Sequence, residues 1–288
     1  MTTPEPPPQS TGSNGSLDEQ SDGSASNDDG RLRQKRPAAS DRLRAHLRQQ
    51  VRTEHADLIM LTCSFISGLV DSTIYNAYGT FVSMQTGNTI FVGLGPSTAH
   101  TTSKPYGWAK SLTSILCFCL GCLFFSRLAR YSGPLRRATL VTSFALQSVI
   151  VFVVAAVIQA GLVNGALDTI DLDIMWKDEI PISLLSFQAA GQIIGSRALG
   201  VSEIPSVVLT SMLCDIASDP DIAAPLKSNA KRNRRALAFT CILVGAIIGG
   251  YVGQVTGRMQ VDLWIAGGIK VLITTAWFFW PEERVELV

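Results

Sequence analysis

Apolar positions form a series of long runs that begins at Leu58 and continues almost to the C-terminus. Most runs hold roughly 20 residues, the length that an α-helix needs to cross a hydrocarbon core about 30 Å thick. The runs predict helical segments at 57–78, 81–97, 108–129, 138–161, 180–201, 204–217, 236–257 and 262–280. The pattern therefore indicates an all-α polytopic membrane protein.

Two of these segments, 81–97 and 204–217, are shorter than the others. If all eight crossed from a cytosolic N-terminus, the arginine-rich loop 127–137 would lie outside, against the positive-inside rule. If the short segments enter the membrane and return, that loop lies inside and the acidic loop 166–179 lies outside. This predicts about six transmembrane helices, two short re-entrant or broken segments, and cytosolic N- and C-termini. Full crossing by both short segments stays open as the alternative.

The order long, short, long, long occurs twice along the chain. A shift of 124 residues places Cys117-x-x-x-Gly121 on Cys241-x-x-x-Gly245 and Thr86 on Thr210. Three crossings in each half would insert the halves in opposite orientations, which predicts a 3+3 inverted repeat. Such repeats are typical of transporters whose sites lie where interrupted segments meet near the midplane. Full crossing of the short segments would give parallel halves instead.

The domain organisation follows from composition as well as from the runs. Residues 1–30 are rich in Pro, Ser, Gly and Asp with few hydrophobes, so they cannot offset the entropy of ordering. The predicted divisions are a disordered cytosolic tail (1–30), a basic juxtamembrane segment (31–56), a first membrane repeat (57–165), an acidic extracytosolic loop (166–179), a second membrane repeat (180–282) and a short cytosolic tail (283–288).

The juxtamembrane segment is strongly cationic, although the whole chain has a net charge of only +1 and gives no sign of nucleic-acid binding. Leu43, Leu47 and Val51 recur every four residues, as in an amphipathic helix lying on an anionic leaflet. A topogenic charge cluster before the first crossing is the alternative. The residues proposed to contact anionic lipid are Arg31, Arg33, Lys35, Arg36, Arg42, Arg44 and Arg48.

Polar residues interrupt the apolar segments, and we interpret Asp71 as the one acidic residue well inside a full-length segment. A charge there costs a few kcal/mol, so it is a functional candidate unless the segment ends near Val70 and Asp71 lies at the outer interface. The run Gln85–Asn88 either binds a solute at a helix break or forms a helix cap or tight turn. The predicted solute-binding residues are Asp71, Tyr75, Gln85, Thr86, Asn88, Gln188, Gln192 and Thr210.

Glycines at strict four-residue spacing mark one face of segment 236–257 for close helix packing. They are Gly245, Gly249, Gly253 and Gly257.

Enzyme chemistry finds no support in the residues. All six cysteines lie in apolar segments and are interpreted as free thiols rather than as metal ligands. The three histidines lie outside the segments, and no phosphate-binding loop ending in Gly-Lys-Ser/Thr occurs. We therefore expect no enzymatic activity, no metal and no cofactor.

The first half of the chain contains a short motif rich in glycine and polar residues. Gly68-x-x-Asp71, followed by GTFVSxxTGN over residues 79–88, resembles the signature of the YoaK-like membrane family, a bacterial and fungal domain of unknown function. A second family signature, a Gly-Gln-Asn-like run ahead of Thr-Gly, is degraded here to Gly191-Gln192 and Thr210-Ser211. The resemblance covers about residues 55–282 and implies a polytopic membrane protein without a settled activity.

The combined prediction is a multi-pass protein, preferentially of the plasma membrane, that transports or conducts a small polar or ionic solute. The alternative is a non-transporting membrane scaffold or sensor in which the polar residues only hold helices together.

Overall fold

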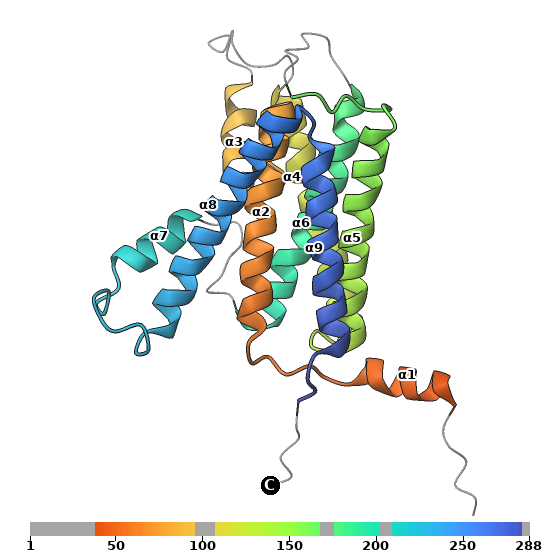
Figure 1. Cartoon of the computed structure of the whole chain (residues 1–288), viewed down its shortest axis with the longest axis vertical. Coiled ribbons are helices and arrows are strands. Elements are labelled where there is room, and N and C mark those ends of the chain that lie inside the picture. The colour runs from red at the N-terminus through yellow and green to blue at the C-terminus, as the bar shows by residue number, and fades with distance from the viewer. Residues whose placement is uncertain (1–37, 96–106, 168–175, 202–208, 284–288) are drawn as a thin grey trace, which may run out of the picture. The chain divides into compact units, whose positions relative to one another are not determined.

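The computed structural model describes residues 38–95, 107–167, 176–201 and 209–283, and residues 39–288 form one compact unit. The described residues form helices and no strand, so the all-α prediction is confirmed. The elements are α1 (Ala39–Arg48), α2 (Ala56–Tyr78), α3 (Gln85–Leu94), α4 (Gly107–Ser132), α5 (Arg137–Gln159), the 3-10 helix η1 (Trp176–Asp178), α6 (Glu179–Ala198), α7 (Leu209–Ala217), α8 (Ala230–Thr256) and α9 (Gln260–Phe279) (Figure 1).

Each of the eight predicted segments corresponds to one helix from α2 to α9. The predicted disordered tail, the cations from Arg31 to Arg36, most of the acidic loop and residues 284–288 lie outside the described residues.

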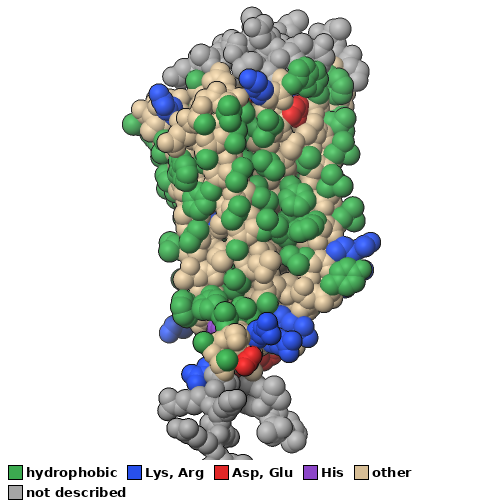
Figure 2. All heavy atoms as spheres, turned by 90° about the vertical axis from the view of Figure 1, so that its right-hand side faces the viewer, with side chains coloured by type: hydrophobic (Ala, Val, Ile, Leu, Met, Phe, Trp, Pro, Cys, Tyr) green, Lys and Arg blue, Asp and Glu red, His purple; other side chains and the backbone are tan. Residues whose placement is uncertain are grey.

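Five of the described helices are long and apolar enough to cross a membrane: α2, α4, α5, α8 and α9. By length and composition, the chain is therefore a multi-pass membrane protein. On the face shown in Figure 2, hydrophobic side chains spread over the middle of the bundle, and most charged side chains lie toward its two ends. This distribution matches an apolar slab bounded by two aqueous interfaces.

Glycines bring α2 and α8 into close contact. An added Cβ on Gly245 would overlap the carbonyl oxygen of Phe65, and one on Gly68 would overlap that of Ile242. Gly249 lies against α2 in the same way, next to Ser72 and Leu69. The backbones of α2 and α8 can approach this closely because a glycine on one helix faces the backbone of the other at each of these contacts.

The other two glycines of the four-residue series lie elsewhere. Gly253 lies beside the Leu167 side chain rather than against α2. Gly257 ends α8 in the left-handed conformation, at φ 64°, and its N–H donates to the carbonyl oxygen of Gly253. Glycine tolerates this conformation without the steric cost that a Cβ would add.

The chain reverses direction after α2. Gly79 ends α2 with φ 73°, and its N–H donates to the carbonyl oxygen of Tyr75 at 2.8 Å. At the far end of α3, Gly95 lies against the Trp108 side chain of α4. The Nζ of Lys110, also at the start of α4, lies 5.3 Å from the ring centroid of Tyr78 at the end of α2. The ends of α2 and α3 therefore lie on the same side of the bundle, because both contact the start of α4.

The segments that precede α2 and follow α9 meet at the opposite end. Val51 is fully buried there, and its N–H donates to the carbonyl oxygen of Leu135 at 3.0 Å. The Arg52 N–H donates to the carbonyl of Pro281 at 3.1 Å, and an isolated antiparallel bridge pairs Val51 with Glu282. Residues far apart in sequence thus form a short backbone clamp beneath the bundle.

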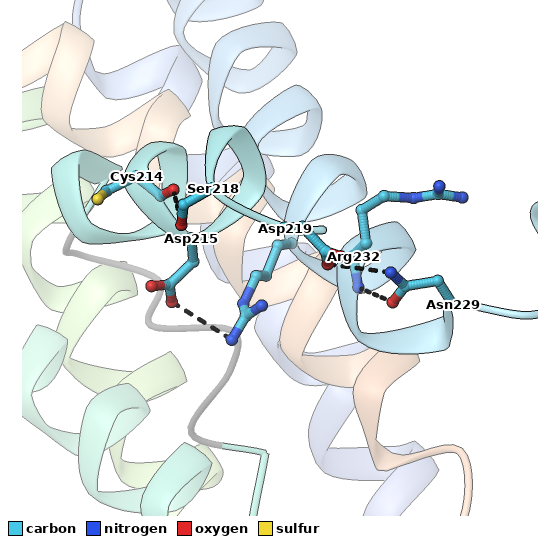
Figure 3. Close-up of polar contacts among 7 residues, drawn as sticks. Cys214, Asp215, Ser218, Asp219, Asn229 and Arg232 are labelled. Atoms are coloured by element: carbon cyan, nitrogen blue, oxygen red, sulfur yellow. Dashed lines mark hydrogen bonds and ion pairs between the residues drawn. The ribbon is translucent and has the colours of Figure 1, made fainter. Parts of the chain in front are cut away.

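The turn between α7 and α8 is held by polar contacts (Figure 3). Asn229 caps α8 by accepting from the Arg232 N–H at 3.0 Å, and its amide donates to Asp219 at 2.9 Å. Hydrogen bonds from Asn229 and from the Asp221 N–H hold the pKa of the Asp219 carboxyl below its ordinary value. Asp215 of α7 lies 3.3 Å from the Arg235 guanidinium of α8, and this exposed ion pair adds little stability.

Candidate functional site

Asp71 fixes the chain reversal between α2 and α3. Its side chain is only 2% exposed, and its Oδ1 accepts from the backbone N–H groups of Val82 at 2.8 Å and Ser83 at 3.0 Å. The Ser83 hydroxyl donates to Oδ2. Since Asp71 lies about two helical turns before the end of α2, residues 79–83 run back into the bundle alongside α2.

Asn88 holds α3 in place from the other side of the turn. It is fully buried, and its Nδ2 donates to the Phe81 carbonyl oxygen at 2.7 Å and to Gln85 Oε1 at 2.9 Å. Its Oδ1 accepts from the Thr80 hydroxyl at 2.9 Å and from the Phe81 N–H at 3.0 Å. The Asn88 amide also reaches Ser114 of α4 at 3.0 Å. All of its polar atoms are paired within the protein, so the network holds structure together without a ligand.

Gln85 belongs to this network, whereas the other predicted site residues make no hydrogen bond with it. Tyr75 is 43% exposed, and its ring stacks on Phe81 with the centroids 4.8 Å apart. Thr86 of α3 and Thr210 of α7 are exposed. Gln188 of α6 is buried, and its Oε1 has no hydrogen-bond partner.

A second polar cluster, centred on Lys270, lies among α2, α5, α6 and α9. Lys270 is fully buried, and its Nζ donates to Gln147 Oε1 at 2.8 Å and to Gln192 Oε1 at 2.6 Å. The Gln192 Nε2 in turn donates to the Ser67 hydroxyl at 3.0 Å. Gln192 is the one predicted site residue in this cluster, and Lys270, Gln147 and Ser67 come from three other helices.

The charge of Lys270 is held by neutral groups. Within the described residues, no carboxylate forms an ion pair with it, and both printed hydrogen-bond acceptors are amide oxygens. An ammonium has three N–H donors, so one is left for a further acceptor. A cation near the centre of a bilayer costs about 3 kcal/mol on insertion scales, and charges of this kind are found at solute and ion pathways.

A buried carboxylate lies on the same face of α9. Asp262 is fully buried; its Oδ2 accepts from the Thr73 hydroxyl at 2.9 Å, and its Oδ1 has no partner. Asp262 and Lys270 are eight residues apart, about 12 Å along the helix axis, and a spacing of twice four residues keeps them on one stripe.

Sequence reasoning missed both of these charges, because it considered only Asp71 as an acid well inside a full-length segment. Asp262 lies in the first turn of α9 and is a second buried carboxylate. A signal was present in the sequence: the apolar segment 262–280 contains an aspartate and a lysine, and intramembrane ionisable residues are functional candidates by default.

The described residues hold no group of three or more His, Cys, Asp or Glu side chains that could bind a metal ion. All six cysteines are free thiols. The clusters described above are therefore built from amides, hydroxyls, two carboxylates and one ammonium.

Comparisons with known proteins identify a family for this chain, but no individual similar protein. Searches of the curated proteins and of the solved structures found no match to the chain. One family model matches residues 59–276, which include both polar clusters and every helix from α3 to α8, and it agrees with the resemblance to the YoaK-like family. The chain therefore belongs to the family described as "Protein of unknown function (DUF1275)".

Proposed function

We propose that this protein transports a small polar or ionic solute across the membrane, with the Lys270 cluster as its intramembrane binding site. The observation that carries the proposal is a fully buried ammonium whose hydrogen-bond partners are two neutral amides. Lys270, Gln147 and Ser67 each lie near the middle of a helix, so the cluster is at mid-depth. A solute at this depth is reached from either side by rearrangement of the surrounding helices.

The topology in this proposal has six crossings. α6 has 20 residues and a rise of about 30 Å, which is enough to span the hydrocarbon core although it is less apolar than the other five helices. α3 and α7 have 10 and 9 residues, so each rises only about 15 Å or less. These lengths favour two helices that enter the membrane without crossing it, and both termini are then cytosolic.

The helix pairing supports an inverted repeat of three crossings in each half. α2 packs on α8 as α4 packs on α6, and α3 contacts α4 as α7 contacts α8. If α2, α3, α4 and α5 are exchanged for α6, α7, α8 and α9 in that order, each of these helix pairs becomes another of them. Gly121 lies against the Phe187 carbonyl of α6 as Gly245 lies against the Phe65 carbonyl of α2. The 124-residue shift also relates the buried Asn88 to the buried Met212.

A flux assay in liposomes tests the site. Lys270→Met removes the charge and keeps most of the side-chain volume, whereas Gln192→Leu removes one acceptor. Since a hydrogen bond to a charged group contributes about 1.5–3 kcal/mol, we expect each variant to slow flux of the transported solute by at least about tenfold. Gln188→Leu is the matched control, because Gln188 lies one turn away from Gln192 on α6 and its Oε1 accepts no hydrogen bond from Lys270.

If folded Lys270→Met transports the solute as fast as the wild type, the Lys270 cluster is not the solute-binding site. If the folded wild-type protein moves no solute from a broad panel, the scaffold becomes the better explanation. One observation favours that second candidate: the Asp71 and Asn88 networks are satisfied internally and act as helix contacts.

A further inference from the structure

A pocket opens at the end of the bundle where α5 and α8 finish and α9 begins. Its volume is about 780 Å³, within the range of small-molecule sites. The walls come from the end of α5 and residues 161–166 after it, from residues 256–258 at the end of α8, from Gln260 at the start of α9, and from Trp176 and Lys177 of η1. In the proposed topology this end faces away from the cytosol. The pocket shares no residue with the Lys270 cluster.

Backbone pairing fixes the two walls against each other. The Met259 N–H donates to the Gly165 carbonyl oxygen at 3.0 Å, and the Leu167 N–H donates to the Gly257 carbonyl at 3.2 Å. An isolated antiparallel bridge joins Ala166 to Arg258 between these bonds. Backbone hydrogen bonds therefore fix the position of the two chain segments that form the pocket walls.

The charge of the described lining is positive. Lys177 and Arg258 line the pocket, and neither side chain makes a hydrogen bond or ion pair that the structure records. No Asp or Glu occurs among the described lining residues. By contrast, Lys110 at the same end of the bundle is neutralised by Asp178 at 2.6 Å. Among the described residues, the two cations at the pocket therefore have no partner of opposite charge.

Gln260 adds a polar group to the pocket wall. It is the first residue of α9 and only 8% exposed, and its Oε1 has no hydrogen-bond partner. A buried amide without a partner is costly unless a bound group satisfies it. The first N–H groups of a helix also have no acceptor inside the helix, and the helix dipole favours negative charge beside them.

We propose that this pocket binds a small oxyanion, a carboxylate or phosphate group that also carries a hydrogen-bond donor. Lys177, Arg258 and the start of α9 hold the negative oxygens, and the donor pairs with the Gln260 amide. Trp176 and Leu162 are 64% and 61% exposed and offer apolar surface for the body of the ligand. The same chemistry is presented by a soluble organic anion and by the headgroup of an anionic lipid. The site does not depend on transport through the Lys270 cluster.

Calorimetric titration of the purified protein tests the soluble source. Protein in a neutral detergent is titrated with sodium phosphate and with sodium lactate, whose hydroxyl supplies a donor. We expect the Lys177→Gln/Arg258→Gln double variant to bind at least about tenfold more weakly than the wild type, because it loses both charge-assisted contacts. Lys227→Gln is the matched control, since Lys227 is an exposed cation in the turn between α7 and α8.

Nanodiscs test the lipid source. The protein is placed in phosphatidylcholine with or without phosphatidylglycerol, and bound phosphatidylglycerol is measured by native mass spectrometry. Loss of lipid retention in the double variant, with no binding of soluble anions by the wild type, would identify the ligand as a headgroup. Equal binding by wild type and double variant in both assays, or no binding by the wild type in either, would overturn the proposal.

Lys270→Met separates this site from the proposed transport site. We expect that variant to bind the oxyanion with wild-type affinity even where it has lost flux. Loss of oxyanion binding in folded Lys270→Met would assign the ligand to the Lys270 cluster and overturn the separate pocket.

Discussion

Asp71→Ala is expected to lower the free energy of unfolding by about 3–5 kcal/mol and to release α3 from the bundle. The substitution leaves three donors without an acceptor in a buried site: the N–H groups of Val82 and Ser83 and the Ser83 hydroxyl. Each unsatisfied buried donor costs about 1–3 kcal/mol, and water does not reach this position freely. Thermal unfolding in detergent measures the stability, and protease sensitivity near residues 79–84 measures the release of α3.

Two further variants sharpen this test. Asp71→Asn keeps one acceptor oxygen and should fall between the wild type and Asp71→Ala. Asp57→Asn removes a carboxylate from the start of the same helix, where its partner Arg234 lies at 2.9 Å and is partly exposed. We expect that loss to be no more than about 1 kcal/mol. Equal destabilisation by Asp57→Asn and Asp71→Ala would show that the buried turn is not the source of the effect.

Gly245→Ala is expected to destabilise the protein by about 1–3 kcal/mol, because the new methyl group separates α8 from α2. The added Cβ would overlap the carbonyl oxygen of Phe65, which belongs to a helix backbone and cannot rotate away. Gly68→Ala should act in the same direction, since its Cβ would overlap the Ile242 carbonyl from the opposite helix. The unfolding temperature of the purified variants in detergent measures both effects.

Gly250→Ala is the control for this series. It makes the same change in the same helix, but an added Cβ there has no neighbour within 4 Å. Alanine favours a helix over glycine by up to about 1 kcal/mol, so this variant should be neutral or slightly stabilising. A loss of stability in Gly250→Ala as large as that in Gly245→Ala would contradict the packing explanation.

The helices themselves could be predicted from the sequence, because a run of about 20 apolar residues has few alternatives to a crossing helix. The predicted segments 57–78 and 138–161 differ from α2 and α5 by two residues or fewer at either end. The break after Tyr78 also follows from local chemistry, since Gly79 adopts a positive φ that most residues avoid. Such signals lie within a few residues of the feature that they predict.

The Lys270 cluster depends on contacts between distant parts of the chain. Gln147 and Gln192 precede Lys270 by 123 and 78 residues, and no local pattern pairs them. The polar character of Thr86 and Thr210 suggested a lining role, but polarity does not say which way a side chain faces. Asp71 and Asn88 are predicted to bind a solute, but a sequence pattern cannot separate a turn whose polar groups pair with one another from a site that binds a ligand.

The backbone clamp beneath the bundle has a consequence for biosynthesis. Gln50, Val51 and Arg52 are made before any membrane helix, but their partners at residues 281–283 are made after the last one. Chains are synthesised from the N-terminus at roughly 5–20 residues per second, so these early residues wait tens of seconds for their partners. The contacts with residues 281–283 therefore form last, and a chain that terminates after α9 but before Pro281 would insert its helices and keep only the contacts of residues 49–51 with residues 135–137.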